Sequence, residues 1–217
     1  MTLWDISPPL TPDIAVWPGD TPLSREVLCD IARGDNLTLS TLRATVHLGA
    51  HADAPSHYGD GAPAIDAVSL EPYLGPCQVL EVHVPAGGTV PPEAVVPRLA
   101  APRVLLRTGS FPDPRDFRED FVALAPGLVD ALADRGVVLV GLDTPSVDPF
   151  ASKELPAHGR LLAHGMAVLE GLVLDGVPEG RYELIALPLR LVGFDASPVR
   201  AVLRSLDEPV SRPSRSP

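Results

Sequence analysis

The sequence contains only two cysteines, Cys29 and Cys77, in 217 residues. Two cysteines are too few for a disulfide framework or a cysteine zinc cage, and this usage fits a reducing compartment. The longest apolar runs, such as 136–142, fall far short of the roughly 20 residues that span a bilayer. The first ten residues contain no basic stretch followed by an apolar run, so we expect no secretory signal. These features predict a cytoplasmic protein without a membrane partner.

Basic residues are scarce relative to acidic ones. Lys and Arg number 17 against 28 Asp and Glu, which gives a formal net charge of −11. Such a charge repels phosphate backbones and anionic lipid, so nucleic acid is not an expected partner. No Gly-x-Gly-x-x-Gly loop follows a predicted strand, which leaves nucleotide cofactors without support. The Gly-x-Ser-x-Gly elbow is also missing, and this argues against serine-hydrolase chemistry.

The remaining composition is that of a folded domain. Hydrophobic residues make up 45% of the chain, enough for one domain with a sizeable core. No internal repeat or linker divides the sequence, so we assign residues 1–207 to a single domain. Residues 208–217 are rich in Ser, Arg and Pro and offer no apolar face, and we expect them to form a mobile tail.

Strand-forming segments outnumber helical ones. Strands are expected at 3–6, within 23–47, and at 77–84, 104–108, 137–142 and 182–189. Helices are expected at 92–99, 126–135 and 155–166. Because the two kinds of element do not alternate regularly, the pattern favours a mixed, sheet-dominated α/β domain over a doubly wound fold.

Half of the histidines lie in residues 47–57, which read His-Leu-Gly-Ala-His-Ala-Asp-Ala-Pro-Ser-His. A random scatter of the six histidines would place about 0.3 of one in this window. A straight strand would leave His47 and His51 roughly 13 Å apart. Gly49 and Pro55 oppose a helix over the same stretch. We therefore expect a sharply bent loop, in which small alanines let the backbone close around a centre.

The chemistry of this loop is that of a metal site. Two imidazoles and one carboxylate, from His47, His51 and Asp53, are ordinary ligands for Zn²⁺ or a similar divalent ion. His57 lies beyond Pro55, where it stays free to act as an acid/base group beside the metal. The same ligand types accept Mn²⁺, Co²⁺ or Fe²⁺, so the pattern leaves the identity of the metal open.

A second pair of candidate ligands, His158 and Glu170, is twelve residues apart. On a continuous helix the two side chains would point about 120° apart, so they converge only if the chain breaks between them. Gly165 is where such a break is expected. Glu170 lies in the apolar stretch 166–174, and a carboxylate buried there needs a cationic partner. The residues alone leave open whether this pair binds a second metal. His83 is expected to be a surface or cross-strand residue.

The run His-x-Gly-x-His-x-Asp-x-Pro-x-His resembles the signature of the cyclase-like metal hydrolases. Further blocks are similar to the bacterial kynurenine formamidases of that family: residues 3–7, 16–21, 46–55, 70–75, 141–148, 182–189 and 195–200. This resemblance covers nearly the whole chain. It implies a domain of the swivelling β/β/α type, assembled as a homodimer.

The resemblance also implies a set of ligands. His47, His51 and Asp53 would hold one zinc ion, and Asp53 would bridge to a second zinc ion held by His158 and Glu170. None of these positions departs from the family pattern.

Two further residues take roles from the resemblance. His57 would transfer protons, and Trp17 would line the substrate pocket. From the residues alone, Trp17 could equally pack as a structural lid. Asp143 could be an acid that orients a ligand histidine, or a turn former beside Pro145.

The reaction implied is hydrolysis of N-formyl-L-kynurenine to L-kynurenine and formate, a step in tryptophan degradation. A formyl anilide is a neutral amide, so metal-activated water and a histidine acid/base suit it. The first alternative is a related amide or lactam hydrolase that acts on substrates such as isatin. The second is a metal-binding protein without turnover, against which the uncoordinated His57 argues.

Overall fold

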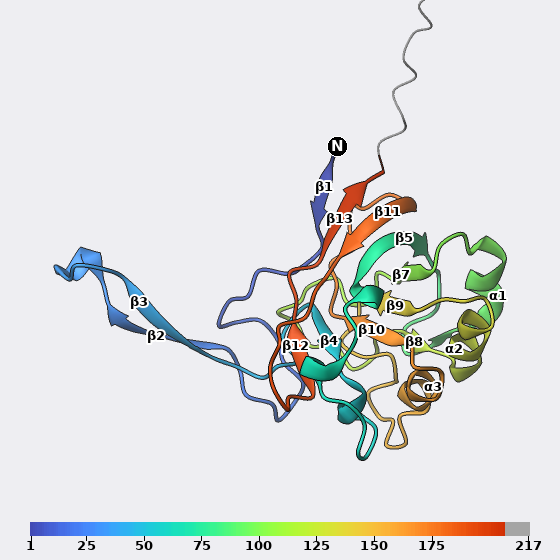
Figure 1. Cartoon of the computed structure of the whole chain (residues 1–217), viewed down its shortest axis with the longest axis horizontal. Helices are drawn as coiled ribbons and strands as arrows, with labels where there is room; N and C mark the ends of the chain where they lie inside the picture. The colour runs from blue at the N-terminus through green and yellow to red at the C-terminus, as the bar shows by residue number, and fades with distance from the viewer. Residues whose placement is uncertain (207–217) are drawn as a thin grey trace, which may run out of the picture.

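A curled, mixed β-sheet organises residues 1–206, which are the residues that the computed structural model describes (Figure 1). Within them, the order of the sheet is β1 (Leu3–Asp5), β13 (Val202–Ser205), β11 (Gly180–Ile185), β5 (Leu74–Glu81), β7 (Arg103–Arg107), β9 (Leu139–Leu142), β10 (Ala167–Glu170), β4 (His51–Asp53) and β12 (Ala196–Pro198). Strands β5, β7, β9 and β10 run parallel, and the strands on either side of them pair antiparallel. The expected sheet-dominated, mixed α/β class is confirmed. The predicted tail at 208–217 lies outside the described residues.

The parallel strands form the centre because they are apolar on both faces. Val104 and Leu106 of β7 belong to one buried cluster, whereas Leu105 between them belongs to another. Alternate residues of a strand point to opposite faces, so the two clusters lie on the two sides of the sheet.

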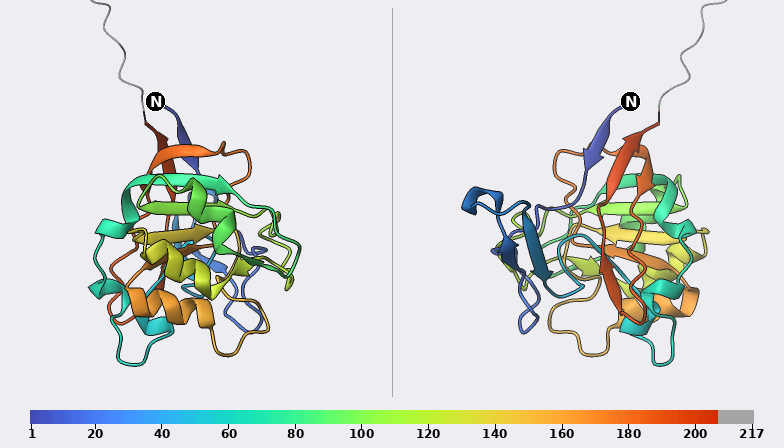
Figure 2. Two further views of the ribbon diagram at one scale, coloured as in Figure 1. Left: turned by 90° about the vertical axis from the view of Figure 1, so that its right-hand side faces the viewer. Right: turned by 60° about the vertical axis from the view of Figure 1, so that its left-hand side comes forward.

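Three helices cover the face to which Val104 points. They are α1 (Pro92–Val95), α2 (Pro126–Ala133) and α3 (Pro156–His164), and Figure 2 shows them together on one side of the sheet. The helix expected at 92–99 is split into α1 and a 3-10 turn at Val96–Arg98, with Pro97 inside that turn. Among the described residues, no helix has the length and apolar character needed to cross a membrane.

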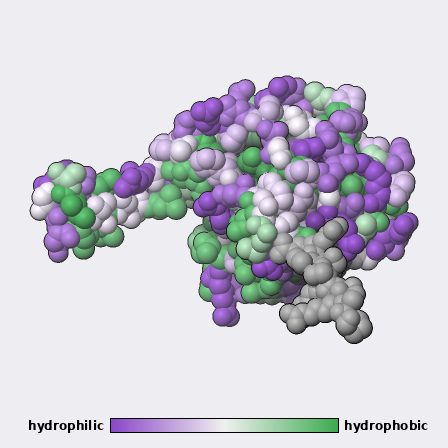
Figure 3. All heavy atoms as spheres, turned by 90° about the horizontal axis from the view of Figure 1, so that it is seen from above, coloured by the Kyte–Doolittle hydropathy of each residue, from purple (hydrophilic) through white to green (hydrophobic). Residues whose placement is uncertain are grey.

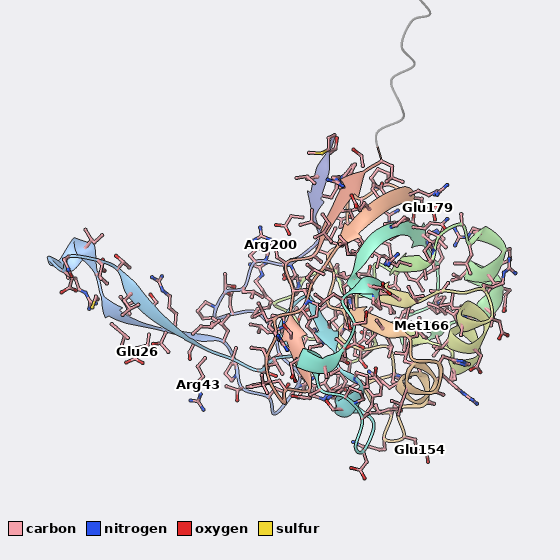
Figure 4. All side chains as sticks on the ribbon, in the orientation of Figure 1. Glu26, Arg43, Glu154, Met166, Glu179 and Arg200 are labelled. Atoms are coloured by element: carbon pink, nitrogen blue, oxygen red, sulfur yellow. The ribbon has the colours of Figure 1, made fainter. Side chains whose placement is uncertain are left out.

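Two shorter pairings complete the strands. The parallel pair β6 (Thr89–Val90) and β8 (Ala123–Leu124) lies beside the helices. The antiparallel hairpin of β2 (Ser24–Cys29) and β3 (Leu39–Arg43) extends away from the sheet as an arm. Figure 4 labels Glu26 and Arg43 on this arm, far from the helices.

The arm carries exposed apolar side chains (Figure 3). Leu28 is 52% exposed and Leu42 66% exposed, and no residue of 24–43 belongs to the core that the described residues bury. Exposed apolar surface of this kind marks sites of protein association.

Candidate metal centre

Five candidate ligands converge at the edge of the sheet where β10 and β4 meet. His51 and Asp53 come from β4, Glu170 ends β10, and His158 lies in the first turn of α3. His47 comes from the loop before β4. Glu170 pairs directly with His51 across the antiparallel β10 and β4 strands, so their side chains leave the sheet on the same face.

The segment 47–57 is only partly the bent loop that we expected. His51–Asp53 is a short strand, followed by a 3-10 turn at Pro55–His57. A strand places His51 and Asp53 on one face, because residues two apart share a side. The bend occurs earlier, at Gly49, whose φ of +57° is in the left-handed region. This bend brings His47 back toward the two strand residues.

His158 and Glu170 meet because the chain breaks where we predicted. Helix α3 ends at Gly165, which has a φ of +60°, and β10 then returns along the sheet. His158 Nε2 lies 3.5 Å from Glu170 Oε1 and 3.5 Å from Asp53 Oδ2. The sequence could not decide on this pair, and the structure brings the two residues together.

Four atoms of this cluster are buried without a hydrogen-bond partner: His51 Nε2, His158 Nε2 and both carboxylate oxygens of Asp53. Buried polar atoms without partners cost about 1–3 kcal/mol each, so such a concentration calls for an absent group. The facing nitrogen and oxygen atoms of the four most buried ligands are 3.4–3.5 Å apart; these ligands are His51, Asp53, His158 and Glu170. Tetrahedral ligands at bonds of about 2.1 Å stand about 3.4 Å from one another. The donor set therefore fits a divalent metal.

The two oxygens of Asp53 face different partners. Oδ1 lies 3.0 Å from His47 Nδ1 and 3.5 Å from His51 Nε2. Oδ2 faces His158 Nε2 instead. The described residues thus offer two ligand groups that share Asp53, one with His47 and His51 and one with His158 and Glu170.

Hydrogen bonds behind the ligands orient two of the imidazoles. The Nδ1 of His51 lies 2.8 Å from the Gly49 carbonyl oxygen. The Nδ1 of His158 lies 2.7 Å from Asp148 Oδ2. In each case Nδ1–H donates to an oxygen, which leaves the lone pair of Nε2 directed at the cluster.

Asp148 was not identified from the sequence. It also accepts the backbone N–H groups of Ala157 and His158, so one carboxylate caps α3 and orients its histidine. Asp143, the acid that the sequence offered for such a role, accepts hydrogen bonds from Thr108 and Gly109 instead. Asp143 makes no hydrogen bond or ion pair with a histidine among the described residues and anchors the turn after β7, while burial raises its pKa.

Charge within the cluster is balanced between carboxylates and histidines. Burial alone would raise the pKa of Asp53, but facing His158 and His47 hold it well below its usual range. Burial likewise opposes protonation of His47, yet the carboxylate of Asp53, whose Oδ1 lies 3.0 Å from His47 Nδ1, outweighs it and raises the pKa of His47 to about 9.

His57 lies next to the ligands, but none of its atoms is among the buried atoms without a hydrogen-bond partner. Its ring centroid is 4.2 Å from that of His47, and its side chain is 34% exposed. Its Nδ1 is 3.5 Å from Asp195 Oδ2, and the same oxygen lies 3.0 Å from His47 Nε2. Asp195, which the sequence analysis gave no role, therefore connects a candidate ligand to the candidate acid/base.

A cavity of about 760 Å³ opens onto the cluster. Its lining includes His51, His57, His158 and Glu170 together with an aromatic wall. Trp17 lines the cavity and packs edge-on against Phe117 at 5.6 Å between ring centroids. Trp17 is therefore part of an aromatic cluster and also faces the cavity.

The other two histidines lie away from the cluster. The His83 side chain is 86% exposed near Glu81, as expected for a surface residue. His164 pairs with Asp130 at the end of α3, at 2.7 Å from Nε2 to Oδ1.

Two comparisons of the sequence with known proteins give matches over most of the chain. The sequence profile of the family described as "Putative cyclase" matches residues 4–149. A kynurenine formamidase from Polaromonas naphthalenivorans (strain CJ2) is 50% identical over 208 residues, which is 95% of this chain and 92% of that protein.

Solved structures share the fold. A potential metal-dependent hydrolase with cyclase activity superposes with a TM-score of 0.80 at 28% identity, covering 93% of this chain and 96% of the other. An isatin hydrolase bound to thioisatinate superposes with a TM-score of 0.79 at 20% identity, covering 93% and 91%. At that identity, the second likeness shows the fold alone.

Proposed function

The chain belongs to the cyclase family, and we propose that it is a kynurenine formamidase that hydrolyses N-formyl-L-kynurenine to L-kynurenine and formate. The observation that carries this proposal is the set of buried ligand atoms of His51, Asp53 and His158 without hydrogen-bond partners, beside a cavity that His51, His158 and His57 line. The half-identical formamidase supports the choice of substrate.

The proposed cofactor is a pair of zinc ions. One ion would be held by His47, His51 and Asp53, and the other by Asp53, His158 and Glu170. The division of the two Asp53 oxygens between these groups supports a bridging role. When bound, such ions polarise a carbonyl and make water nucleophilic at neutral pH.

The protein side chains supply the proton transfers and the binding surface. His57 would take a proton from the attacking water and return it to the aniline nitrogen as the C–N bond of the formamide breaks. Asp195 would hold the His57 ring through its Nδ1. Trp17 would pack against the aromatic ring of the substrate from the cavity wall.

A homodimer in the cytoplasm is part of the same proposal. The exposed apolar side chains of the β2–β3 arm, among them Leu28 and Leu42, support association with a second copy.

The decisive test is hydrolysis of N-formyl-L-kynurenine, followed through the absorbance of the released L-kynurenine. We expect rapid turnover that a chelator abolishes and added Zn²⁺ restores, because four buried atoms of His51, Asp53 and His158 have no hydrogen-bond partner among the described residues. Isatin serves as the comparison substrate for the lactam-hydrolase alternative. Metal-loaded protein that opens isatin and leaves the formamide intact would establish that alternative instead.

Asp148→Asn tests the orientation of His158. The substitution keeps the size of the side chain but replaces the charged carboxylate that accepts the His158 Nδ1–H by a neutral amide. We therefore expect the affinity for zinc to fall about 10- to 100-fold. The affinity is measured by competition with a chromophoric chelator. Asp130→Asn is a matched control, since it breaks an Asp–His pair of equal length on the surface. Equal zinc affinity in both variants would contradict the role of Asp148.

A further inference from the structure

Arg107 is the one lysine or arginine among the described residues that line the cavity. It ends β7, and its guanidinium is fixed on two sides. Nη1 donates to the Val177 carbonyl at 2.7 Å, and Nη2 donates to Glu81 Oε2 at 2.5 Å. A guanidinium has five N–H donors, so these two bonds leave three for a ligand. Arg107 is thus a positioned cation with unused donors.

Asp175 lines the same cavity and is exposed. It makes no hydrogen bond or ion pair with the residues that the structure describes, including Arg107. The other acidic side chains of the lining outside the ligand set are engaged: Asp20 with Thr45, Asp143 with Thr108, and Asp195 with His47. Asp175 is two residues from Val177, whose carbonyl accepts from Arg107. The cavity is therefore lined by a carboxylate with no described partner and by a guanidinium that keeps unused N–H donors beyond its pair with Glu81.

The sheet sets the backbone distance from Arg107 to the metal centre. Leu105 of β7 is in register with Gly141 of β9, which is in register with Leu169 of β10. Arg107 ends β7 and Glu170 ends β10, so the two residues lie at the same end of these parallel strands, two strands apart, and both line the cavity. Two strand spacings amount to about 10 Å, which is the scale of one small substrate molecule.

We propose that Arg107 and Asp175 form a subsite for an amino-acid zwitterion, in which Arg107 binds the α-carboxylate and Asp175 the α-ammonium group. This inference rests on the proposed function. The formyl anilide end of the substrate is neutral and belongs at the metal centre. The opposite end carries one charge of each sign, and charge-assisted bonds to fixed partners recognise such groups strongly. The subsite would select amino-acid formamides over simple aryl formamides.

The test compares two substrates that share the aryl ketone and the formamide. N-Formyl-L-kynurenine carries the amino-acid group, and 2-formamidoacetophenone lacks it. For Arg107→Gln we expect kcat/KM with the first substrate to fall about 10- to 100-fold, mainly through KM, and to stay within about twofold with the second. Asp175→Asn, which breaks no hydrogen bond or ion pair within residues 1–206, should show the same selectivity with a smaller change.

Arg98→Gln is the matched control. Arg98 also donates to a backbone carbonyl and pairs with a glutamate, Glu179, but it does not line the cavity (Figure 4 labels Glu179). We expect it to leave both substrates unaffected. Equal losses with both substrates in Arg107→Gln, or no loss with either, would overturn the subsite.

Binding of the product separates the subsite from the proposed reaction. If the wild-type protein hydrolyses neither substrate, the proposed function is wrong. The subsite is then tested by measuring the affinity of L-kynurenine for the wild-type protein and for Arg107→Gln by calorimetry. The zwitterion subsite is supported if Arg107→Gln weakens the binding of L-kynurenine and leaves the binding of 2-aminoacetophenone unchanged. L-Kynurenine that does not bind, or binds equally to both proteins, overturns it.

Discussion

Replacing His57 by alanine is expected to lower kcat by about 10²- to 10⁴-fold while the protein keeps its full metal content. The expectation follows from the position of the ring. His57 lines the cavity, its side chain is one-third exposed, and none of its atoms is among the buried atoms without a hydrogen-bond partner. Loss of the ring therefore removes a proton carrier and leaves the buried ligands in place.

The measurement pairs steady-state kinetics with metal analysis of the same sample. His83→Ala is the control, since that side chain is 86% exposed and does not line the cavity. A fully active His57→Ala would show that another group transfers the proton. A variant that loses metal would instead make His57 a ligand, in the group that it forms with His47 and Asp195.

The candidate ligands could be predicted because they are close in sequence or have a local signal. His51 and Asp53 are two residues apart, and a short strand is enough to put them on one face. Gly165 signalled the end of α3 and so the return of Glu170 to His158. What could not be predicted is how the Asp53 oxygens divide between two groups, because this depends on side-chain placement from three elements.

The residues behind the ligands gave no sequence signal. Asp195 lies 148 positions from His47, and the two meet only because β12 pairs with β4. Asp148 caps α3 from eight residues before its first residue, Pro156, outside the usual capping spacing. By local context Asp143 was the acid that the sequence offered for this role, and only the fold brings Asp148 to His158 instead.

The strands of the sheet also differ in how well the sequence predicts them. Strands β7 and β9 were predictable because central parallel strands are continuous apolar runs. Strand β4 was missed because His-Ala-Asp has little intrinsic preference for a strand. It forms because β10 and β12 pair with it from both sides. Tertiary pairing overrides local preference where the candidate ligands lie.

Asp53→Asn is expected to cost at least about 10³-fold in kcat/KM and to leave the protein without stoichiometric metal. Asp53 is fully enclosed, and its two oxygens face His47 and His51 on one side and His158 on the other. An amide offers one neutral oxygen and one N–H donor group, so it cannot bridge two cations. Both proposed metal positions depend on this single carboxylate, which explains why a near-isosteric change should have the largest effect.

Thermal unfolding distinguishes loss of metal from loss of fold. A metal that binds only the native state raises the melting temperature, so a chelator should lower that of the wild-type protein and leave that of Asp53→Asn unchanged. Asp60→Asn is the control, because Asp60 is an exposed acid in the loop after η2 (Pro55–His57) and should behave as the wild type. If Asp53→Asn retained metal and a chelator-sensitive melting temperature, the bridging role would be wrong, and each ion would be held by the remaining ligands alone.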